Sequence, residues 1–219
     1  MCGRFAITMP AEAMAAPFGA VPGNDLPAGP DFNICPTDTV GAVTSAEGLR
    51  RLRPMRWGFL PGWYKSPGDG PLLINARADT LARKPAFAAA ARQRRCLIPA
   101  SGFYEWQKGP QGSRLPWYAS RRDGAPLAFA AIWQDWAREG RSLTSCAIVT
   151  IAANARMAEI HDRMPVILEP ADWPLWLGEA GHGAAALMRP AGDGVLQLHR
   201  VGPAVNATRA EGPELIEPI

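Results

Sequence analysis

Residues 96–106 read CLIPASGFYEW, and this stretch decides the fold class more than any other part of the chain. It contains an apolar run, Cys96–Ile98, and after a short Pro-Ala-Ser connection a second run, Gly102–Trp106, that is rich in aromatic side chains. Short runs of apolar and aromatic residues that end at Pro, Ser and Gly are typical of β-strands. The stretch therefore predicts two closely spaced strands.

Strand-like runs recur on both sides of this stretch. We expect them around Leu72–Ile74, Leu127–Trp133, Ser145–Ile151, Pro165–Leu168 and Val195–Val201. Helix patterns are fewer and short: residues 80–83 after a cap at Asp79 or Thr80, then Ala86–Arg94, Ala153–Ile160 and Asp172–Leu177. Because strands dominate and helices do not alternate with them regularly, we predict an α+β protein with mainly antiparallel strands. The length predicts a single domain over residues 1–219.

The composition agrees with many short elements. The chain has 219 residues, of which 22 are Gly and 22 are Pro without a Gly-X-Y period, so collagen is excluded and long helical bundles are disfavoured. Residues 20–32 and 61–71 are rich in turn-forming residues and predict loops. No apolar run approaches the ~20 residues of a membrane helix, and the start has no secretory signal pattern. We therefore expect a cytoplasmic protein without membrane contact.

Neither a metal nor another cofactor is predicted. The four cysteines, Cys2, Cys35, Cys96 and Cys146, form no CxxC pair, and we expect them to be free thiols. The net charge is +3, with the excess of basic residues in the first half of the chain. This bias permits a polyanionic partner without requiring one. Nearly all cations are arginines, whose planar guanidinium groups suit bidentate phosphate contacts.

The start of the chain, MCGRF, carries the most distinctive chemistry. Methionine aminopeptidases remove Met1 when the second side chain is small, and Cys2 meets that condition. The mature chain would then begin with an α-amine of pKa about 8 and a thiol of pKa about 8.5 on adjacent carbon atoms. Such a 1,2-aminothiol reacts with an aldehyde to give an imine and then a thiazolidine. Alternatively, the thiol acts as a nucleophile with the amine as its base.

Two places offer cations and an amide that suit an oxygen-rich ligand. Arg4 lies two residues after Cys2 and suits a phosphate. Asn75 and Arg77 follow the run Leu72–Ile74 directly, and they share one side of an extended segment because side chains repeat every two residues.

Two residues are candidates for proton transfer. Glu105 lies inside an aromatic strand, where it is either exposed on the polar face or buried with a raised pKa, which would make it usable as an acid or a base. His161 lies between a predicted helix and a predicted strand, and histidine is the side chain best suited to move protons near neutral pH. The aromatic pair Trp63–Tyr64 and residues 33–36 lie in a part of the chain rich in arginine, a combination typical of single-stranded nucleic-acid sites.

Four motifs occur in order along the chain. They are MCGRF at 1–5, INAR at 74–77 followed by Asp79-Thr80, GFYEW at 102–106 and IHDRMPVIL at 160–168. Together they resemble the SOS response-associated peptidase (SRAP) family of abasic-site processing proteins. The sequence VNATRAEGPELIEPI at 205–219 resembles the closing segment of the same family.

The resemblance implies a fold in which antiparallel strands curl into a barrel-like core with helices around it. It also implies a sensor of abasic sites in single-stranded DNA and at single–double-strand junctions. We expect this sensor to be a monomer that associates with the nucleoid when it is bound to damaged DNA. After loss of Met1, Cys2 would form a covalent thiazolidine crosslink with the ring-opened sugar and so protect the lesion. AP-lyase activity and self-processing peptidase activity belong to this expectation, whereas proteolysis of other proteins does not.

The resemblance also assigns roles to individual residues. Cys2 is the covalent nucleophile, Asn75 orients the terminal residue or the sugar, Glu105 handles protons, and His161 serves crosslink formation or reversal. The expected DNA contacts are Arg4 and Arg77 at phosphates, Pro36 with Trp63 and Tyr64 as wedge or stacking residues, and Asn33 and Trp106 beside them. Tyr64 stands where relatives are expected to have a second tryptophan.

Two other functions stay open at this point. A glutaminase-type N-terminal-nucleophile amidohydrolase would use the Cys2 thiol on glutamine together with an oxyanion hole, but Arg4 and the IHDRMPVIL segment fit it poorly. A non-covalent single-strand DNA-binding module would use the aromatic and arginine side chains in salt-sensitive binding, and it would not need Cys2.

Overall fold

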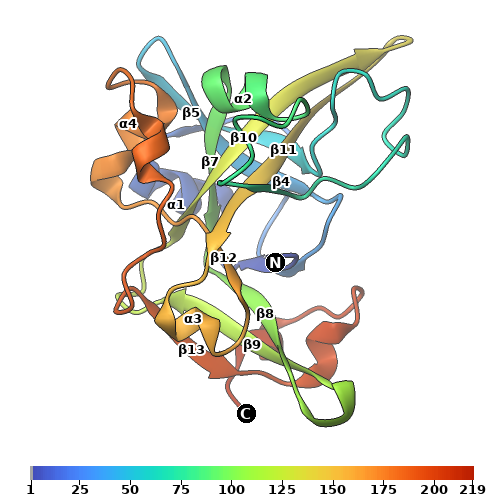
Figure 1. The fold of residues 1–219 in the computed structure, drawn as a ribbon, viewed down its shortest axis with the longest axis vertical. Coiled ribbons are helices and arrows are strands. Elements are labelled where there is room, and N and C mark those ends of the chain that lie inside the picture. The colour runs from blue at the N-terminus through green and yellow to red at the C-terminus, as the bar shows by residue number, and fades with distance from the viewer. Residues whose placement is uncertain (1) are drawn as a thin grey trace.

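A closed barrel of five strands forms the centre of the molecule in the computed structural model, which describes residues 2–219 (Figure 1). The strands are β4 (Thr39–Ala46), β5 (Leu49–Trp57), β7 (Arg95–Ala100), β10 (Leu127–Arg138) and β11 (Arg141–Ala152). They pair antiparallel in the order β11-β10-β7-β4-β5, and β5 closes the ring by pairing in parallel with β11. The predicted barrel-like, mainly antiparallel core is thus confirmed, and the single parallel closure makes the barrel mixed.

Three short strands extend the barrel sheet. They are β2 (Val21–Pro22), which is parallel to β5, β6 (Asn75–Arg77), which is parallel to β11, and β12 (Arg163–Pro165), which is antiparallel to β11. Because β6 and β12 both pair with β11, the two segments that carry Asn75 and His161 lie close together although they are far apart in the sequence.

A second sheet of five antiparallel strands lies below the barrel in the view of Figure 1. Its order is β13 (Leu196–Arg200), β9 (Arg114–Arg121), β8 (Gly102–Lys108), β1 (Phe5–Ile7) and β3 (Asp31–Ile34). Only Ser101 separates β7 from β8, so the stretch 96–106 carries the chain directly from the barrel into the second sheet. A Cβ at Gly102 would collide with the ring of Tyr118, so the missing side chain at this crossing leaves room for that ring.

The helices are short and lie outside the barrel, as predicted (Figure 1). They are α1 (Ala11–Ala15), α2 (Ala88–Gln93), α3 (Ala155–Ala158) and α4 (Trp173–Leu177), with 3-10 turns at Ala16–Phe18, Pro110–Gly112, Pro170–Asp172, Ala184–Leu187, Pro203–Asn206 and Pro213–Ile216. In the part of the chain from residue 2 onward, no helix is long and apolar enough to cross a membrane.

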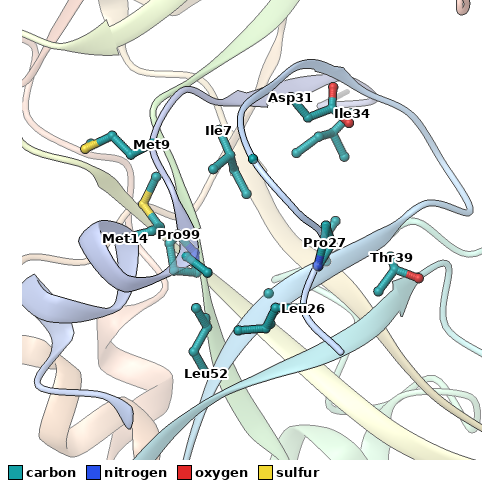
Figure 2. Close-up of a pocket in the computed structure, with 14 residues that line it drawn as sticks. Ile7, Met9, Met14, Leu26, Pro27, Asp31, Ile34, Thr39, Leu52 and Pro99 are labelled. Carbon is teal, nitrogen blue, oxygen red and sulfur yellow. The ribbon is translucent and has the colours of Figure 1, made fainter. Parts of the chain in front are cut away.

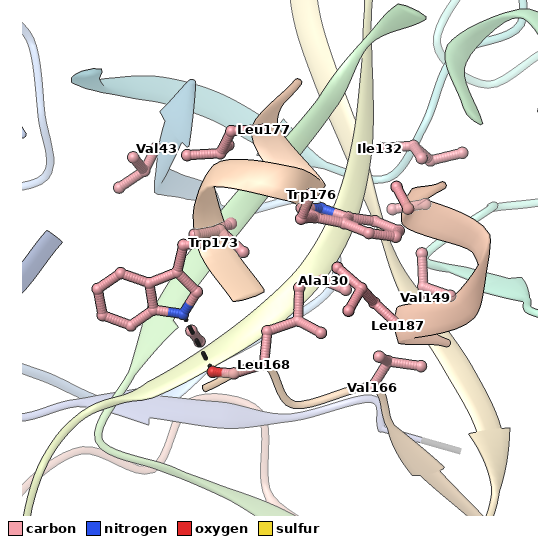
Figure 3. Close-up of a cluster of buried hydrophobic side chains, with 14 of the residues drawn as sticks. Val43, Ala130, Ile132, Val149, Val166, Leu168, Trp173, Trp176, Leu177 and Leu187 are labelled. Atoms are coloured by element: carbon pink, nitrogen blue, oxygen red, sulfur yellow. Dashed lines mark hydrogen bonds between the residues drawn. The ribbon is translucent and has the colours of Figure 1, made fainter. Parts of the chain in front are cut away.

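The barrel strands bury both of their faces, in two separate clusters. Figure 3 shows the first cluster, in which Trp173 and Trp176 of α4 pack near Ala130 and Ile132 of β10. The indole N–H of Trp173 donates to the Leu168 carbonyl at 3.0 Å, so this large side chain buries no unpaired donor. The second cluster holds Cys2 together with Phe5, Trp57 and Phe129, whose rings meet edge to face.

Several sequence-based boundaries are wrong, and each has a physical reason. The strand expected around Leu72–Ile74 instead spans the next residues, Asn75–Arg77, because these are the residues that pair with β11. Residues 80–83 form turns rather than a helix, with Thr80 and Leu81 N–H groups bonded to the Arg77 carbonyl. Strands β1 to β5 and β9 were not predicted. In β5 arginines interrupt the apolar pattern, whereas β4 and β9 contain Gly41 and Pro116, which are disfavoured inside strands.

Candidate active site

A polar cleft of about 390 Å³ lies where β8, the segment between α3 and β12, and the chain around residue 206 meet. Its lining residues are Gly3, Arg4, Glu105, Trp106, Arg114, His161 and Asn206. Four of the seven, Arg4, Glu105, Trp106 and His161, are predicted site residues from three separate segments of the sequence. The cleft is therefore the place where the fold brings the predicted chemistry together.

A second cavity near α1 is a poor candidate by comparison (Figure 2). Its volume is about 40 Å³, close to the space of one water molecule, and Ile7, Met14, Leu26 and Leu52 are among its mostly apolar lining residues. A cavity of this size and lining holds no substrate and offers no acid–base pair.

Cys2 is fully buried next to the cleft and is fixed through its backbone. The Nδ2 group of Asn75 donates to the Cys2 carbonyl at 2.9 Å, and β6 holds Asn75 in place by pairing with β11. Among the residues that the structure describes, the buried Oδ1 atom of Asn75 has no hydrogen-bond partner. Asn75 thus positions the first residues of the chain, and it keeps one acceptor for a group that enters the site.

The thiol of Cys2 is neutral in this environment. Burial raises the pKa of the Cys2 thiol far above its usual range, and the nearby carboxylate of Glu105 raises it further. The hydrogen bond from the backbone N–H of Arg4 lowers the pKa of this thiol, but it does not offset the increase caused by burial and by Glu105. The thiol therefore needs a proton acceptor at the moment when it reacts.

Glu105 is 3% exposed, and burial raises the pKa of its carboxyl group. The charge of His161 and the backbone N–H of Trp106 lower this pKa and limit the shift. A carboxyl group with a raised pKa exchanges protons closer to neutral pH than an exposed one. Of the two alternatives for Glu105, an exposed or a buried carboxyl group, the structure shows the buried one.

A hydrogen bond from a nearby backbone N–H group orients the imidazole ring of His161. The backbone N–H of Arg163 donates to its Nδ1 atom at 3.0 Å, so the neutral ring carries its proton on Nε2. Asp162 also lies 3.0 Å from Nδ1, but its side chain is 88% exposed and pairs only with the protonated ring. Asn154 accepts a hydrogen bond from the Met157 N–H and so caps α3, which begins the short turn leading to His161.

Arg4 and Asn33 are buried and bonded to each other. Arg4 is 8% exposed, and its Nη1 group donates to Asn33 Oδ1 at 2.6 Å and to the Val205 carbonyl at 3.0 Å. Asn33 in turn donates to the carbonyls of Ala207, Thr208 and Ala210. Arg4 lines the cleft, whereas Asn33 connects Arg4 to the chain at 205–210.

Trp106 also lines the cleft, together with two residues that sequence reasoning did not predict. Its indole N–H donates to Asn206 Oδ1 at 2.6 Å, and the guanidinium group of Arg114 lies 4.9 Å from its ring centre. Asn206 lies within the quoted segment 205–219, so the motif pointed to it without singling it out. Arg114 belongs to no quoted motif, and only strand pairing between β8 and β9 places it near Trp106.

Arg77 lies outside the cleft on an exposed surface. Its side chain is 55% exposed and makes a long ion pair of 3.4 Å with Asp79. Arg163 lies 3.8 Å from the same carboxylate and donates to the Thr150 carbonyl at 2.7 Å. Burial lowers the pKa of Arg163, and the charge of Arg77 lowers it further, so two cations share one carboxylate here.

The aromatic pair Trp63–Tyr64 divides into one exposed and one buried side chain. Trp63 is 58% exposed, whereas Tyr64 is 8% exposed and packs with Leu60 and Trp136. Pro36 is half-buried in the connection between β3 and β4. Trp63 therefore remains available for stacking, while Tyr64 anchors the loop 61–71 from inside.

The described residues show no group of three or more His, Cys, Asp or Glu side chains that would hold a metal ion. The cleft instead combines a carboxyl group, an imidazole and guanidinium groups beside a cysteine. This set suits acid–base and nucleophilic chemistry on a substrate that carries negative charge.

Comparisons with known proteins agree along almost the whole chain. A family model described as "SOS response associated peptidase (SRAP)" matches residues 1–208. The abasic site processing protein YoqW of Bacillus subtilis is 33% identical over 224 residues, which cover 99% of this chain and 99% of that protein. The abasic site processing protein YedK of Escherichia coli is 32% identical over 100% of both chains.

The fold has a solved counterpart. A crystal structure of a protein from Bacteroides thetaiotaomicron superposes with a TM-score of 0.89 over 100% of both chains at 21% identity. The resemblance in sequence motifs, the match to the family model and the relatives of equal length all agree. The chain belongs to the SRAP family.

Proposed function

We propose that this chain processes abasic sites in DNA and does so by covalent capture through Cys2. The relatives YoqW and YedK carry the name abasic site processing protein, and they match the full length of this chain. The proposed substrate is single-stranded DNA with an abasic site, including sites at single–double-strand junctions. The crosslink would shield the lesion during the DNA damage response.

The proposed reaction starts when Met1 is removed, by the chain itself or by a methionine aminopeptidase. The free α-amine of Cys2 then attacks the aldehyde of the ring-opened sugar and forms an imine with release of one water molecule. The Cys2 sulfur adds to the imine carbon, the thiol proton ends on the nitrogen, and a five-membered thiazolidine results. In sum, one aldehyde and one aminothiol give one thiazolidine and one water.

The observation that carries this proposal is the setting of Cys2. Asn75 holds its carbonyl at 2.9 Å, and Glu105 and His161 line the adjoining cleft. Glu105, whose pKa burial raises, would deliver protons to the departing sugar oxygen and accept the proton of the α-amine. His161, with its Nδ1 atom occupied by the Arg163 N–H, would present Nε2 to crosslink formation or reversal.

The proposed DNA path uses exposed and half-buried residues around this point. Arg4 lines the cleft and Arg77 lies on the adjoining surface, and both would contact phosphates that flank the lesion. Trp63 would stack on a base, Pro36 would separate neighbouring bases, and Trp106 would contact the strand inside the cleft. Tyr64 would support Trp63 rather than touch DNA.

A denaturing gel tests the proposal directly. The mature protein is incubated with single-stranded DNA that contains one abasic site, and mass spectrometry confirms that Met1 is absent. We expect a shifted band that requires both the lesion and Cys2, so Cys2→Ala should give none. Cys35→Ala is the matched control, because Cys35 is a half-buried free thiol that lies outside the lining of the cleft.

Two further reactions sharpen the result. Borohydride reduction of the abasic site converts its aldehyde to an alcohol and should prevent the shifted band. An N-terminal extension that blocks the α-amine should also prevent it. A stable crosslink by Cys2→Ala would overturn the thiazolidine assignment, and glutamine hydrolysis without DNA would support the amidohydrolase instead.

A further inference from the structure

Trp106 holds two guanidinium groups at once inside the cleft. The carbon centres of the Arg4 and Arg114 guanidinium groups lie 5.8 and 4.9 Å from its ring centre. The indole cannot turn freely, because its N–H donates to Asn206 Oδ1 at 2.6 Å. Trp106 is therefore a fixed platform that brings two cations to one cleft.

Arg114 differs from the arginines of this chain that carboxylates hold in place. Arg121 is bonded to Asp123 at 2.8 Å and to Glu169 at 2.9 Å, and Arg50 is bonded to Glu179 at 2.7 Å. Arg114 has no hydrogen bond to its side chain and no carboxylate partner within residues 2–219. A guanidinium group that stacks by its face keeps the N–H donors along its edge for a ligand.

Arg4 adds a second unused donor. Its Nη1 group is bonded to Asn33 and Val205, but its buried Nε atom has no hydrogen-bond partner in the described part of the chain. Leaving a buried donor unpaired costs free energy, about 1–3 kcal/mol in typical cases. An acceptor supplied by a ligand would remove that cost.

We propose that Arg114 and Arg4, arranged around Trp106, form a subsite for one backbone phosphate of the DNA strand. The inference rests on the proposed function, and it deepens it by adding Arg114 as a phosphate-contacting residue. A phosphodiester carries one negative charge and two free oxygens, which match two guanidinium edges. Because the same cleft contains Glu105 and His161, a phosphate held there would fix the register of the neighbouring sugar.

A mutant cycle with modified DNA tests this subsite without requiring the covalent reaction. Binding is measured in the Cys2→Ala background, with single-stranded DNA that carries a tetrahydrofuran analogue of the abasic site. Single phosphates on either side of the analogue are replaced, one at a time, by neutral methylphosphonates. The protein variants are Arg114→Ala and the control Arg141→Ala, which removes the same charge at an exposed hairpin position outside the cleft.

We expect Arg114→Ala to weaken binding about 3–10-fold and to lower the salt slope by ~0.7, the value for one phosphate contact on a single strand. At one position, the methylphosphonate should weaken DNA binding by the Cys2→Ala parent by a similar factor. At that same position it should not weaken DNA binding by the Arg114→Ala variant any further. Arg141→Ala should show no such dependence on position. Inorganic phosphate alone should compete only weakly, because it lacks the rest of the strand.

The subsite would be overturned if, at every methylphosphonate position, the loss of binding added to the loss caused by Arg114→Ala. It would also be overturned if Arg114→Ala and Arg141→Ala weakened binding equally. Strong competition by inorganic phosphate without any position dependence would overturn it too, since the ligand would then be a free anion. The outcome is separate from the crosslinking test. If the losses from Arg114→Ala and one methylphosphonate were not additive but no Cys2-dependent crosslink formed, the phosphate subsite would be supported and the covalent function would be overturned.

Discussion

Burial of Glu105 makes the stability of the protein depend on pH. Burial raises the pKa of its carboxyl group above the ordinary 4.5, so the folded protein favours the neutral acid. The stability that this group contributes is fully present below pH 4.5 and is lost as pH rises through the folded pKa. We therefore predict that Glu105→Gln, which stays neutral, raises the melting temperature at pH 8 more than at pH 5. Thermal unfolding at both pH values checks this, and an equal gain at both would contradict the burial of a titrating carboxyl group.

Asn75 acts through the position of Cys2. Asn75→Ala removes one hydrogen bond, so we predict a stability loss of only about 1 kcal/mol. The rate of crosslinking should fall roughly 10–100-fold, because the aminothiol is no longer held in place. Single-turnover kinetics measure the rate, and binding in the Cys2→Ala background should change little. A parallel loss of binding would assign Asn75 to DNA contact instead.

At the scale of elements, the crossing from β7 to β8 depends on Gly102. Its strand pairs with Ala6 on one side and Ser120 on the other, and a Cβ there would meet the Tyr118 ring and the Ala119 carbonyl. We predict that Gly102→Ala destabilises the protein by about 1–3 kcal/mol through overpacking. Gly194→Ala is the control, since a Cβ there has open space. Calorimetry should show a lower melting temperature for Gly102→Ala alone.

The elements differ in how well the sequence predicts them. The runs Gly102–Trp106 and Val195–Val201 are predicted closely, because local apolar and aromatic patterns define them. Strand β5 alternates arginines with buried Leu52, Met55 and Trp57, and its arginines conceal the strand pattern. Closure of the barrel joins β5 to β11 across about ninety residues, and no local pattern contains that contact.

At the scale of the molecule, Asn33 ties the beginning of the chain to its last segment. It accepts a buried hydrogen bond from Arg4 and donates to three part-buried carbonyls at 207, 208 and 210. We predict that Asn33→Ala costs about 2–4 kcal/mol, because the buried Arg4 and three part-buried carbonyls lose their partner together. Denaturant unfolding measures the loss. A variant as stable as the parent but weaker in DNA binding would restore Asn33 to the DNA contacts that the sequence predicts.

The assembled site is only partly predictable for the same reason. Cys2, Asn75, Glu105 and His161 are recognisable from their residue types and motifs, and the fold brings all four to one place. The sequence cannot separate an exposed Trp63 from a buried Tyr64, because that difference arises from packing against Trp136. Nor does it indicate Arg114, since pairing of two strands brings that residue to Trp106.

The bond between Arg4 and Val205 spans 201 residues and therefore has a consequence in time. A ribosome that adds about 5–20 residues per second needs roughly 10–40 s to make the partner of Arg4. After the first residues have emerged from the ribosome, their final anchor at Val205 has still to be made. Cys2, which the finished fold buries, is exposed during this time, and an enzyme that performed the proposed removal of Met1 would reach it. The proposed removal of Met1 would therefore come before the site is assembled.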